Sequence, residues 1–345
     1  IDSFKDSASQ EEINAEILKR LNKYSHIQPL FFKMADGGEG TMESLCDKFI
    51  EIDVVDPIFR PIKQRLGFFQ DYVVVEMAQA SGLQLLQPQE RNPMHTSTYG
   101  FGQAIKEALK ISKKLILTVG GSATCDCGLG MLEALGATFY KNNSQIQRVT
   151  PDKLLQFDKI DLKQLQAVQF DEIIVLSDVQ NLLTGKDGSA YVYAPQKGAS
   201  QQEVEILDSF LNRVQNYFEY PENPADGAAG GIIYTLRNLL QAKVVSGASF
   251  VLQQQNFIES TKDCKVLITG EGSFDGQTKC GKAVSQVCSL FNGKKVGIFG
   301  SIKDDWRGVL NSAFCVQKGC YSLQEGISRA LECIGDTVEA IVGLL

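Results

Sequence analysis

One stretch of the sequence combines the residue types that phosphate chemistry needs. Residues 266–282 read VLITGEGSFDGQTKCGK: an apolar run predicts a strand to Thr269, and Gly270, Glu271 and Gly272 predict a turn. A helix is expected from about Lys282. A strand that ends in glycines before a helix exposes backbone N–H groups, which together with the helix dipole suit a phosphate. With Glu271 and Asp275 able to hold a metal ion or accept a proton, the stretch predicts one wall of a phosphoryl-transfer site.

The same stretch also contains a partial P-loop pattern. Residues 276–282 match G-x-x-x-x-G-K, but the next residue is Ala283, where a P-loop needs a Ser or Thr hydroxyl for Mg²⁺. The glycines also follow Asp275 instead of ending the strand directly. The sequence therefore disfavours a true P-loop.

Length and charge narrow the class of protein. A chain of 345 residues suggests about two domains, and its composition is that of a globular protein. The net charge is −7, the pI is about 5.1, and no basic run is present. Nucleic acid and anionic membranes are therefore disfavoured as partners. An anionic substrate would have to be neutralised by local lysines, backbone amides and a bound cation.

The cysteines indicate a compartment. There are nine, an odd number, and they are scattered, so a disulfide framework is disfavoured and a reducing cytoplasm is expected. A zinc site from Cys125, Cys127 and Cys280 is disfavoured because the chain has no C-x-x-C pair and only two histidines. The chain starts at Ile1 on what resembles the end of a strand, so the N-terminus is expected a few residues upstream.

Several other segments repeat the order of strand, acid or glycines, and helix. A strand at 30–34 precedes Asp36 and a helix at 42–49, and a strand at 115–119 precedes a glycine loop and a helix at 131–135. A third strand, at 172–176, ends before Asp178. In one parallel sheet all such strand ends lie on one edge, where ligands bind in open α/β folds. The expected site is therefore a crevice at that edge.

The cationic candidates each have a structural alternative. Arg91 suits a carboxylate or phosphate clamp, although a structural ion pair is equally expected. Lys5 and Lys197 could neutralise a phosphate or be solvated lysines.

Two helices are also expected: one capped by Ser9 and Glu12, and a last one at 323–345.

Taken together, the motifs resemble those of the type I (bacterial) glycerate kinases, along essentially the whole chain. They are DSFK (2–5), MADGGEGT (34–41), VVVEMAQASGL (73–83), RNPMHTSTYGFG (91–102), VGGSATCDCGLGMLEALGATF (119–139), SDVQN (177–181), PQKGA (195–199), GAAGG (227–231) and ITGEGSFDGQTKCGK (268–282). The chain departs from the family pattern at Cys125 and Cys127, which replace Asn and Gly, and at Leu182, which replaces Pro.

The resemblance implies ATP- and Mg²⁺-dependent phosphorylation of D-glycerate, with 2-phosphoglycerate as the expected product, at a cleft between two α/β domains. One domain is expected to be flavodoxin-like, a three-layer fold with a parallel sheet, formed by residues 1–60 and 255–345. The other is expected to be restriction-endonuclease-like and inserted at 61–254, with 96–138 as an alternative part of the first. A kinase for another small hydroxy acid and a non-catalytic nucleotide- or metabolite-binding protein remain alternatives, and a homo-oligomer is left open.

The resemblance and the motifs together predict the following site residues. Asp178 and Asp275 are expected to share the roles of Mg²⁺ ligand and catalytic base. Lys282 is expected to neutralise the transferring phosphate. Arg91 is expected to clamp the glycerate carboxylate. The further substrate-binding candidates are Ser3, Lys5, Asp36 and Asn181. The further nucleotide-binding candidates are Gly120, Gly121, Ser122, Thr124, Lys197, Gly270, Glu271 and Gly272.

Overall fold

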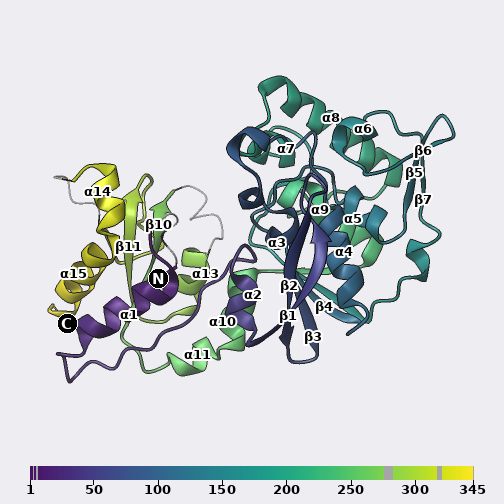
Figure 1. Cartoon of the computed structure of the whole chain (residues 1–345). Helices are drawn as coiled ribbons and strands as arrows, with labels where there is room; N and C mark the ends of the chain where they lie inside the picture. The colour runs from purple at the N-terminus through teal and green to yellow at the C-terminus, as the bar shows by residue number, and fades with distance from the viewer. Residues whose placement is uncertain (3, 5–6, 276–282, 317–320, 345) are drawn as a thin grey trace. The chain divides into compact units, whose positions relative to one another are not determined.

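The computed structural model describes residues 1–345 except 3, 5–6, 276–282, 317–320 and 345 (Figure 1). The chain divides into two compact units: unit 1 comprises Ile1–Ala35 and Ala248–Leu345, and unit 2 comprises Asp36–Gly247. The expected boundaries at 60/61 and 254/255 differ from this division. At the first boundary, the reason is a strand at Lys48–Val55 that pairs along its whole length with Pro61–Phe69 and so belongs to unit 2.

Unit 2 is built on a six-stranded sheet in the order β1-β2-β3-β4-β8-β9. The first three strands are an antiparallel meander, and β3, β4, β8 and β9 run parallel. A separate three-stranded antiparallel sheet has the order β6-β5-β7. The strand bounds are β1 (Lys48–Val55), β2 (Pro61–Phe69), β3 (Tyr72–Glu76), β4 (Lys114–Thr118), β5 (Thr138–Lys141), β6 (Ser144–Ile146), β7 (Lys159–Asp161), β8 (Glu172–Leu176) and β9 (Lys243–Val245).

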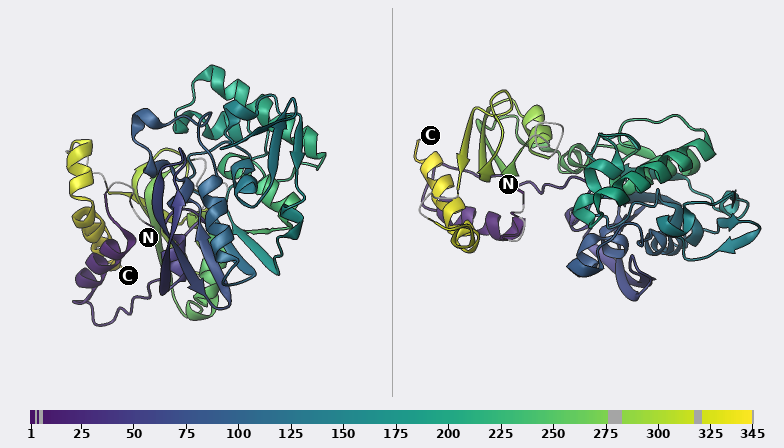
Figure 2. Two further views of the ribbon diagram at one scale, coloured as in Figure 1. Left: turned by 45° about the vertical axis from the view of Figure 1, so that its right-hand side comes forward. Right: turned by 90° about the horizontal axis from the view of Figure 1, so that it is seen from above.

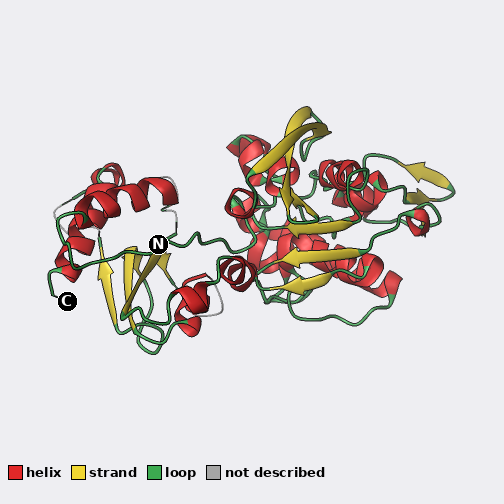
Figure 3. Ribbon diagram, turned by 90° about the horizontal axis from the view of Figure 1, so that it is seen from below, coloured by secondary structure: helices red, strands yellow, loops and turns green. Residues whose placement is uncertain are grey.

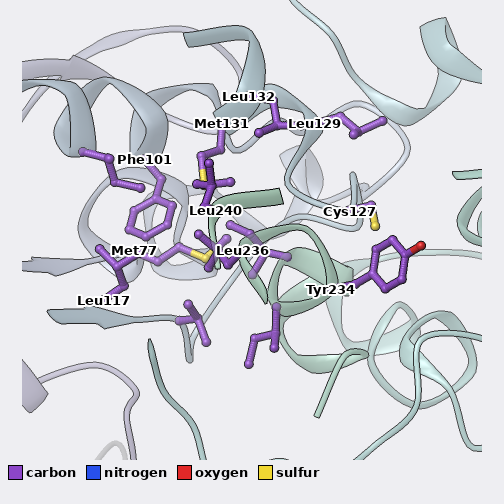
Figure 4. Close-up of a cluster of buried hydrophobic side chains, with 14 of the residues drawn as sticks. Met77, Phe101, Leu117, Cys127, Leu129, Met131, Leu132, Tyr234, Leu236 and Leu240 are labelled. Carbon is purple, nitrogen blue, oxygen red and sulfur yellow. The ribbon is translucent and has the colours of Figure 1, made fainter. Parts of the chain in front are cut away.

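Helices pack against this sheet to form one large apolar core. The helices are α2 (Thr41–Leu45), α3 (Ala78–Ser81), α4 (Tyr99–Ala108), α5 (Leu129–Ala134), α6 (Pro151–Leu154), α7 (Ser189–Tyr193), α8 (Gln201–Phe218) and α9 (Ala228–Leu240), with 3₁₀ turns η1 (Leu83–Leu85), η2 (Pro88–Glu90), η3 (Leu165–Ala167) and η4 (Pro195–Lys197). Figure 4 shows Phe101 of α4, Leu117 of β4 and Leu236 of α9 in this core, and all three are fully buried. This packing fixes the strand ends that carry the candidate residues.

Unit 1 contains a parallel sheet in the order β10-β11-β12, covered by helices on both faces (Figures 2 and 3). One apolar cluster joins α1, α15 and the Val296 and Ile298 face of β11, and a second joins α10, α11, α13 and the Phe299 face. The elements are α1 (Gln10–Leu21), α10 (Gly247–Gln254), α11 (Phe257–Ser260), β10 (Val266–Phe274), α13 (Ala283–Leu290), β11 (Lys294–Ile302), β12 (Ser312–Cys315), α14 (Leu323–Ser328) and α15 (Ala330–Val342).

The mixed α/β class with parallel strands is confirmed. The parallel strands belong to two sheets, one in each unit, and do not share the single sheet edge that we expected. The Ser9 and Glu12 capping box is confirmed at the start of α1. No helix in the described ranges is long and apolar enough to cross a membrane.

Four local expectations were wrong. Residues 30–34 form no strand, because side chains of Gln10 and Gln255 satisfy the backbone there. The helix expected at 42–49 ends at Leu45, because residues 48 and 49 already belong to β1. The last helix is broken into α14 and α15 at Arg329. The strand expected to end at Thr269 continues to Phe274, paired with β11.

Candidate functional site

The acid loop, residues 36–40, lies against the carboxyl ends of two parallel strands of unit 2. The carbonyl oxygen of Gly37 accepts hydrogen bonds from the backbone N–H groups of Val119 and Gly120, both at 3.0 Å. A Cβ at Gly37 would lie 2.3 Å from the carbonyl oxygen of Leu176, and its φ of +87° favours glycine. The motif therefore fastens the Asp36 segment to the ends of β4 and β8.

The glycine loop, residues 120–124, follows β4 and touches the acid loop. A Cβ at Gly120 would lie 2.5 Å from the Cα of Gly38. On the other side, Gly121 accepts a hydrogen bond from the backbone N–H of Leu83 at 2.9 Å, and Ala123 donates one to Ser81 at 2.8 Å. Gly120, Gly121 and Ser122 are therefore held between the acid loop and the segment that joins α3 to η1.

Asp178 and Asn181 follow the end of β8, the neighbour of β4. Asp178 is half-buried. The amide of Asn181 donates to the carbonyl of Asp187 at 2.8 Å and accepts from the hydroxyl of Tyr193 at 2.6 Å. The structure thus brings Asp36, Asp178 and the glycine loop to one sheet edge, whereas the Asn181 side chain is used in holding its own loop.

Lys197 is buried, with 4% of its surface exposed. Its ammonium donates to the Ser122 hydroxyl at 2.8 Å and to the Thr124 carbonyl at 2.7 Å. Burial lowers the pKa of Lys197 to about 8, which the nearby Cys125 and Asp126 oppose. The alternative of a solvated lysine was wrong, because this cation lies directly behind the glycine loop.

Arg91 lies next to the segment that carries Lys197. A Cβ at Gly198 would lie 2.0 Å from the carbonyl oxygen of Arg91, and the φ of Gly198 is +96°. The Arg91 Nε donates to the carbonyl of Leu86 at 3.3 Å. No carboxylate of the described residues forms an ion pair with this guanidinium, so the structural ion pair is not found there.

Asp126, in the same glycine-rich segment, is fully buried and has a structural task. Its carboxylate accepts hydrogen bonds from the backbone N–H and hydroxyl of Thr98, both at 2.8 Å, and from the N–H groups of Gly128 and Gly130 at 3.1 and 3.2 Å. Burial raises its pKa, and these donors oppose that shift. Asp126 therefore joins the starts of α4 and α5.

The GAAGG motif, residues 227–231, packs against the backbone at the end of the glycine loop. Ala229, Gly230 and Gly231 all have positive φ values, and a Cβ at Gly230 would lie 2.1 Å from the Thr124 carbonyl oxygen. Cys127 also has a positive φ, +54°, and donates its backbone N–H to Gly230 at 3.0 Å. Figure 4 shows Cys127 in the core near Tyr234. The cysteine therefore keeps the left-handed conformation that a glycine would adopt more easily.

Glu76, the last residue of β3, was not among the residues expected at the site. Its carboxylate accepts hydrogen bonds from the acid-loop N–H of Gly40 at 3.2 Å and from that of Met42 at 3.0 Å. One feature of the sequence could have indicated Glu76: it ends the apolar run VVVEM, residues 73–77. An acid next to buried residues must have a polar partner or lie where the strand ends.

The candidate residues of unit 1 lie in different secondary structure from the turn that we expected. Gly270, Glu271 and Gly272 lie within β10 and not in a turn, and a Cβ at Gly270 would lie 1.8 Å from the Ile298 carbonyl oxygen. Asp275 follows the end of β10 and is half-buried. Ser3, Lys5 and Lys282, together with the partial P-loop at 276–282, lie outside the described residues.

Unit 1 also contains a cavity of about 820 Å³, which lies along the first half of β10 and under residues 26–34. Its lining includes Val266 to Thr269 but neither Gly270 nor Asp275. The cavity therefore does not contain the residues that the sequence predicts for phosphate binding, and we do not take it as the candidate site.

A dedicated metal cage is absent from the part of the chain that the structure describes, since no three His, Cys, Asp or Glu side chains there group suitably. Mg²⁺ in kinases is commonly held by one or two carboxylates together with substrate phosphates. Asp178, at a strand end beside the glycine loop, has the donor chemistry for that arrangement. Asp178 is therefore a described carboxylate at this edge with the oxygen ligands that Mg²⁺ prefers.

Gly120 and Gly121 offer a matched pair of substitutions. G120A places a methyl group against the acid-loop backbone, so we expect a loss of about 1–3 kcal/mol in the free energy of unfolding. G121A meets only Ala78 at 3.4 Å but has a φ of +76°, so we expect a loss of about 1 kcal/mol. Chemical denaturation measures both, and a milder effect for G120A than for G121A would contradict the crowding argument.

Comparisons with known proteins give a consistent result. The sequence profile described as the glycerate kinase family matches residues 1–345. A glycerate kinase of Halalkalibacterium halodurans is 35% identical, covering 95% of this chain and 92% of the relative, and glycerate 2-kinase of Escherichia coli K12 is 33% identical, covering 88% and 84%. A crystal structure assigned as glycerate kinase 2 from Salmonella typhimurium LT2 has a TM-score of 0.79 at 30% identity and covers 99% of this chain and 96% of its own.

Proposed function

Because this chain belongs to the glycerate kinase family, we propose that it transfers the γ-phosphoryl group of ATP to D-glycerate and forms 2-phosphoglycerate. The 2-position is supported by the name of the Escherichia coli relative, a glycerate 2-kinase. The observation that carries the proposal is the meeting of the acid loop, the glycine loop and Asp178 at one parallel sheet edge of unit 2.

The roles follow from what phosphoryl transfer needs, which is positioning and neutralisation of charge. Gly121 and Ser122 bind nucleotide phosphates through backbone N–H groups. Gly120 holds this loop against the acid loop with its own N–H, which donates to Gly37. Lys197 supplies positive charge next to Ser122, and Thr124 completes the loop. Arg91 clamps the glycerate carboxylate with its planar fork of donors, a choice supported by the absence of an ion pair among the described residues. Asp36 lies on the substrate side of this edge, and Asn181 contributes there by holding the loop that follows Asp178.

Asp178 is the proposed carboxylate for Mg²⁺ or for the attacking hydroxyl. The cation would neutralise charge on the transferring phosphate. For unit 1 the proposal retains Asp275 as the second carboxylate, Lys282, Ser3 and Lys5 as cationic or polar groups, and Gly270, Glu271 and Gly272 as nucleotide contacts. Unchanged turnover in D275N would remove Asp275 from this set.

We also propose a fold type for each unit and a cellular compartment for the protein. A parallel sheet with helices on both faces supports a flavodoxin-like unit 1, and we propose the inserted unit 2 as the restriction-endonuclease-like domain. The described cysteines are all free thiols, which supports the reducing cytoplasm.

The experiment is product analysis by phosphorus NMR after incubation with ATP, Mg²⁺ and D-glycerate. We expect a 2-phosphoglycerate resonance that is lost when EDTA removes Mg²⁺. Parallel ADP-release assays with lactate, tartronate and glucarate test the alternative of another hydroxy-acid kinase. ATP binding without turnover of any of these acids would favour the non-catalytic alternative.

A further inference from the structure

Glu76 is a buried acid whose carboxylate is aimed at the acid loop and not at solvent. It is 1% exposed, and its two oxygens are divided between the N–H groups of Gly40 and Met42. Its backbone carbonyl accepts a hydrogen bond from the Gln64 amide at 3.0 Å. An acid is costly to bury, so a carboxylate kept in this position must be held by the donors it satisfies.

The charges around Glu76 set when it ionises. Burial and the like charge of Glu43 raise its pKa to about 7, against the Met42 and Gly40 N–H groups and the Gln79 side chain, which lower it. Arg65 of β2 forms an ion pair with Glu43. The Cys46 thiol after α2 also faces this group, with a pKa raised to about 12, and stays neutral.

The acid loop is fastened at two points, and both lead to proposed site residues. Glu76 holds Gly40 at its end, while the Gly37 carbonyl receives the N–H groups of Val119 and Gly120 in its middle. Between them, the Gly38 N–H donates to Asp36 at 2.9 Å. Loosening the Glu76 attachment therefore frees one end of the segment that packs on Gly120.

We propose that Glu76 is a positioning residue of the kinase site: its ionised carboxylate holds the acid loop against the glycine loop, and its protonation loosens that hold. This inference rests on the proposed function, because the loops it aligns are those assigned to substrate and nucleotide. Glu76 acts through Gly40 and Met42 and does not itself touch substrate.

The first variant is E76Q, which keeps the shape but replaces one acceptor oxygen by an amide that cannot accept. We expect kcat/KM for glycerate to fall about tenfold or more at pH 8, the effect of losing a hydrogen bond to a charged acceptor. Wild-type activity should fall as the pH drops through about 7. E76Q should lose that step and show a flatter profile between pH 6 and 8.

The second variant, E43Q, gives a readout that a purely structural role would not change. Removing the like charge lowers the pKa of Glu76, so the acid limb should shift to lower pH while the plateau activity stays within about twofold of wild type. E51Q, an exposed acid on β1, is the matched control and should leave both midpoint and plateau unchanged.

The outcomes separate the two proposals. A wild-type protein that fails to phosphorylate glycerate contradicts the proposed function. An active wild type with the same pH profile in E76Q, or an E43Q profile that does not move, overturns the role of Glu76. If E76Q does not fold, as shown by circular dichroism, the E43Q shift alone decides.

Discussion

Replacing Lys197 with methionine is expected to reduce turnover of ATP and D-glycerate by about a hundredfold or more. The buried ammonium donates to the neutral Ser122 and Thr124 oxygens, and no described carboxylate forms an ion pair with it. A phosphate bound at the glycine loop would therefore supply its counter-charge. Methionine fills a similar volume without the charge, so steady-state kinetics would report the loss of that interaction.

The same substitution has a consequence for stability that depends on pH. The pKa of Lys197 is lowered from 10.5 in the unfolded chain to about 8 when folded, so the unfolded chain holds the proton more tightly between these values. The free energy of unfolding should therefore rise with pH across that window, by up to about 3 kcal/mol, and the charged form should cost stability below pH 8.

Denaturation of wild type and K197M at pH 7 and pH 10 measures this effect. In K197M the free energy of unfolding should not show the wild-type increase between pH 7 and pH 10. The control K186M, which replaces an exposed lysine, should show that increase and normal turnover. Wild-type turnover in K197M would remove this lysine from the site, and an unchanged pH dependence would show that it is not buried as a cation.

Replacing Asp126 with alanine is expected to cost about 3–5 kcal/mol in the free energy of unfolding. The change leaves four buried donors without an acceptor: two on Thr98 and the N–H groups of Gly128 and Gly130. Because these donors belong to the starts of α4 and α5, the glycine loop should also lose its support. Thermal and urea unfolding would measure the loss.

The matched control is D53A. Asp53 is exposed at 87% and pairs with Lys63 at 3.3 Å, so its removal should change stability by less than about 1 kcal/mol. A D126A protein as stable as D53A would contradict the structural task assigned to Asp126.

Local patterns in the sequence were sufficient where the structure depends on near neighbours. The Ser9 and Glu12 capping box needs residues three positions apart, and the parallel strands β4 and β8 contain the apolar runs 115–117 and 173–176. These patterns fixed the α/β class and placed the glycine loop and Asp178 at strand ends. The ordered motifs, taken together, also predicted the family.

Only the tertiary structure decided what depends on distant partners. The sequence does not show that the side chains of Gln255 and Gln10 accept hydrogen bonds from the backbone N–H groups of residues 33 and 34. It also does not show that pairing with β11 continues β10 through Gly270 to Phe274. It also cannot distinguish the buried cation Lys197 from a surface lysine, or Asp126 from a ligand-binding acid. Burial and the identity of hydrogen-bond partners from remote segments set the charge and task of each group, and neither is encoded in spacing along the chain.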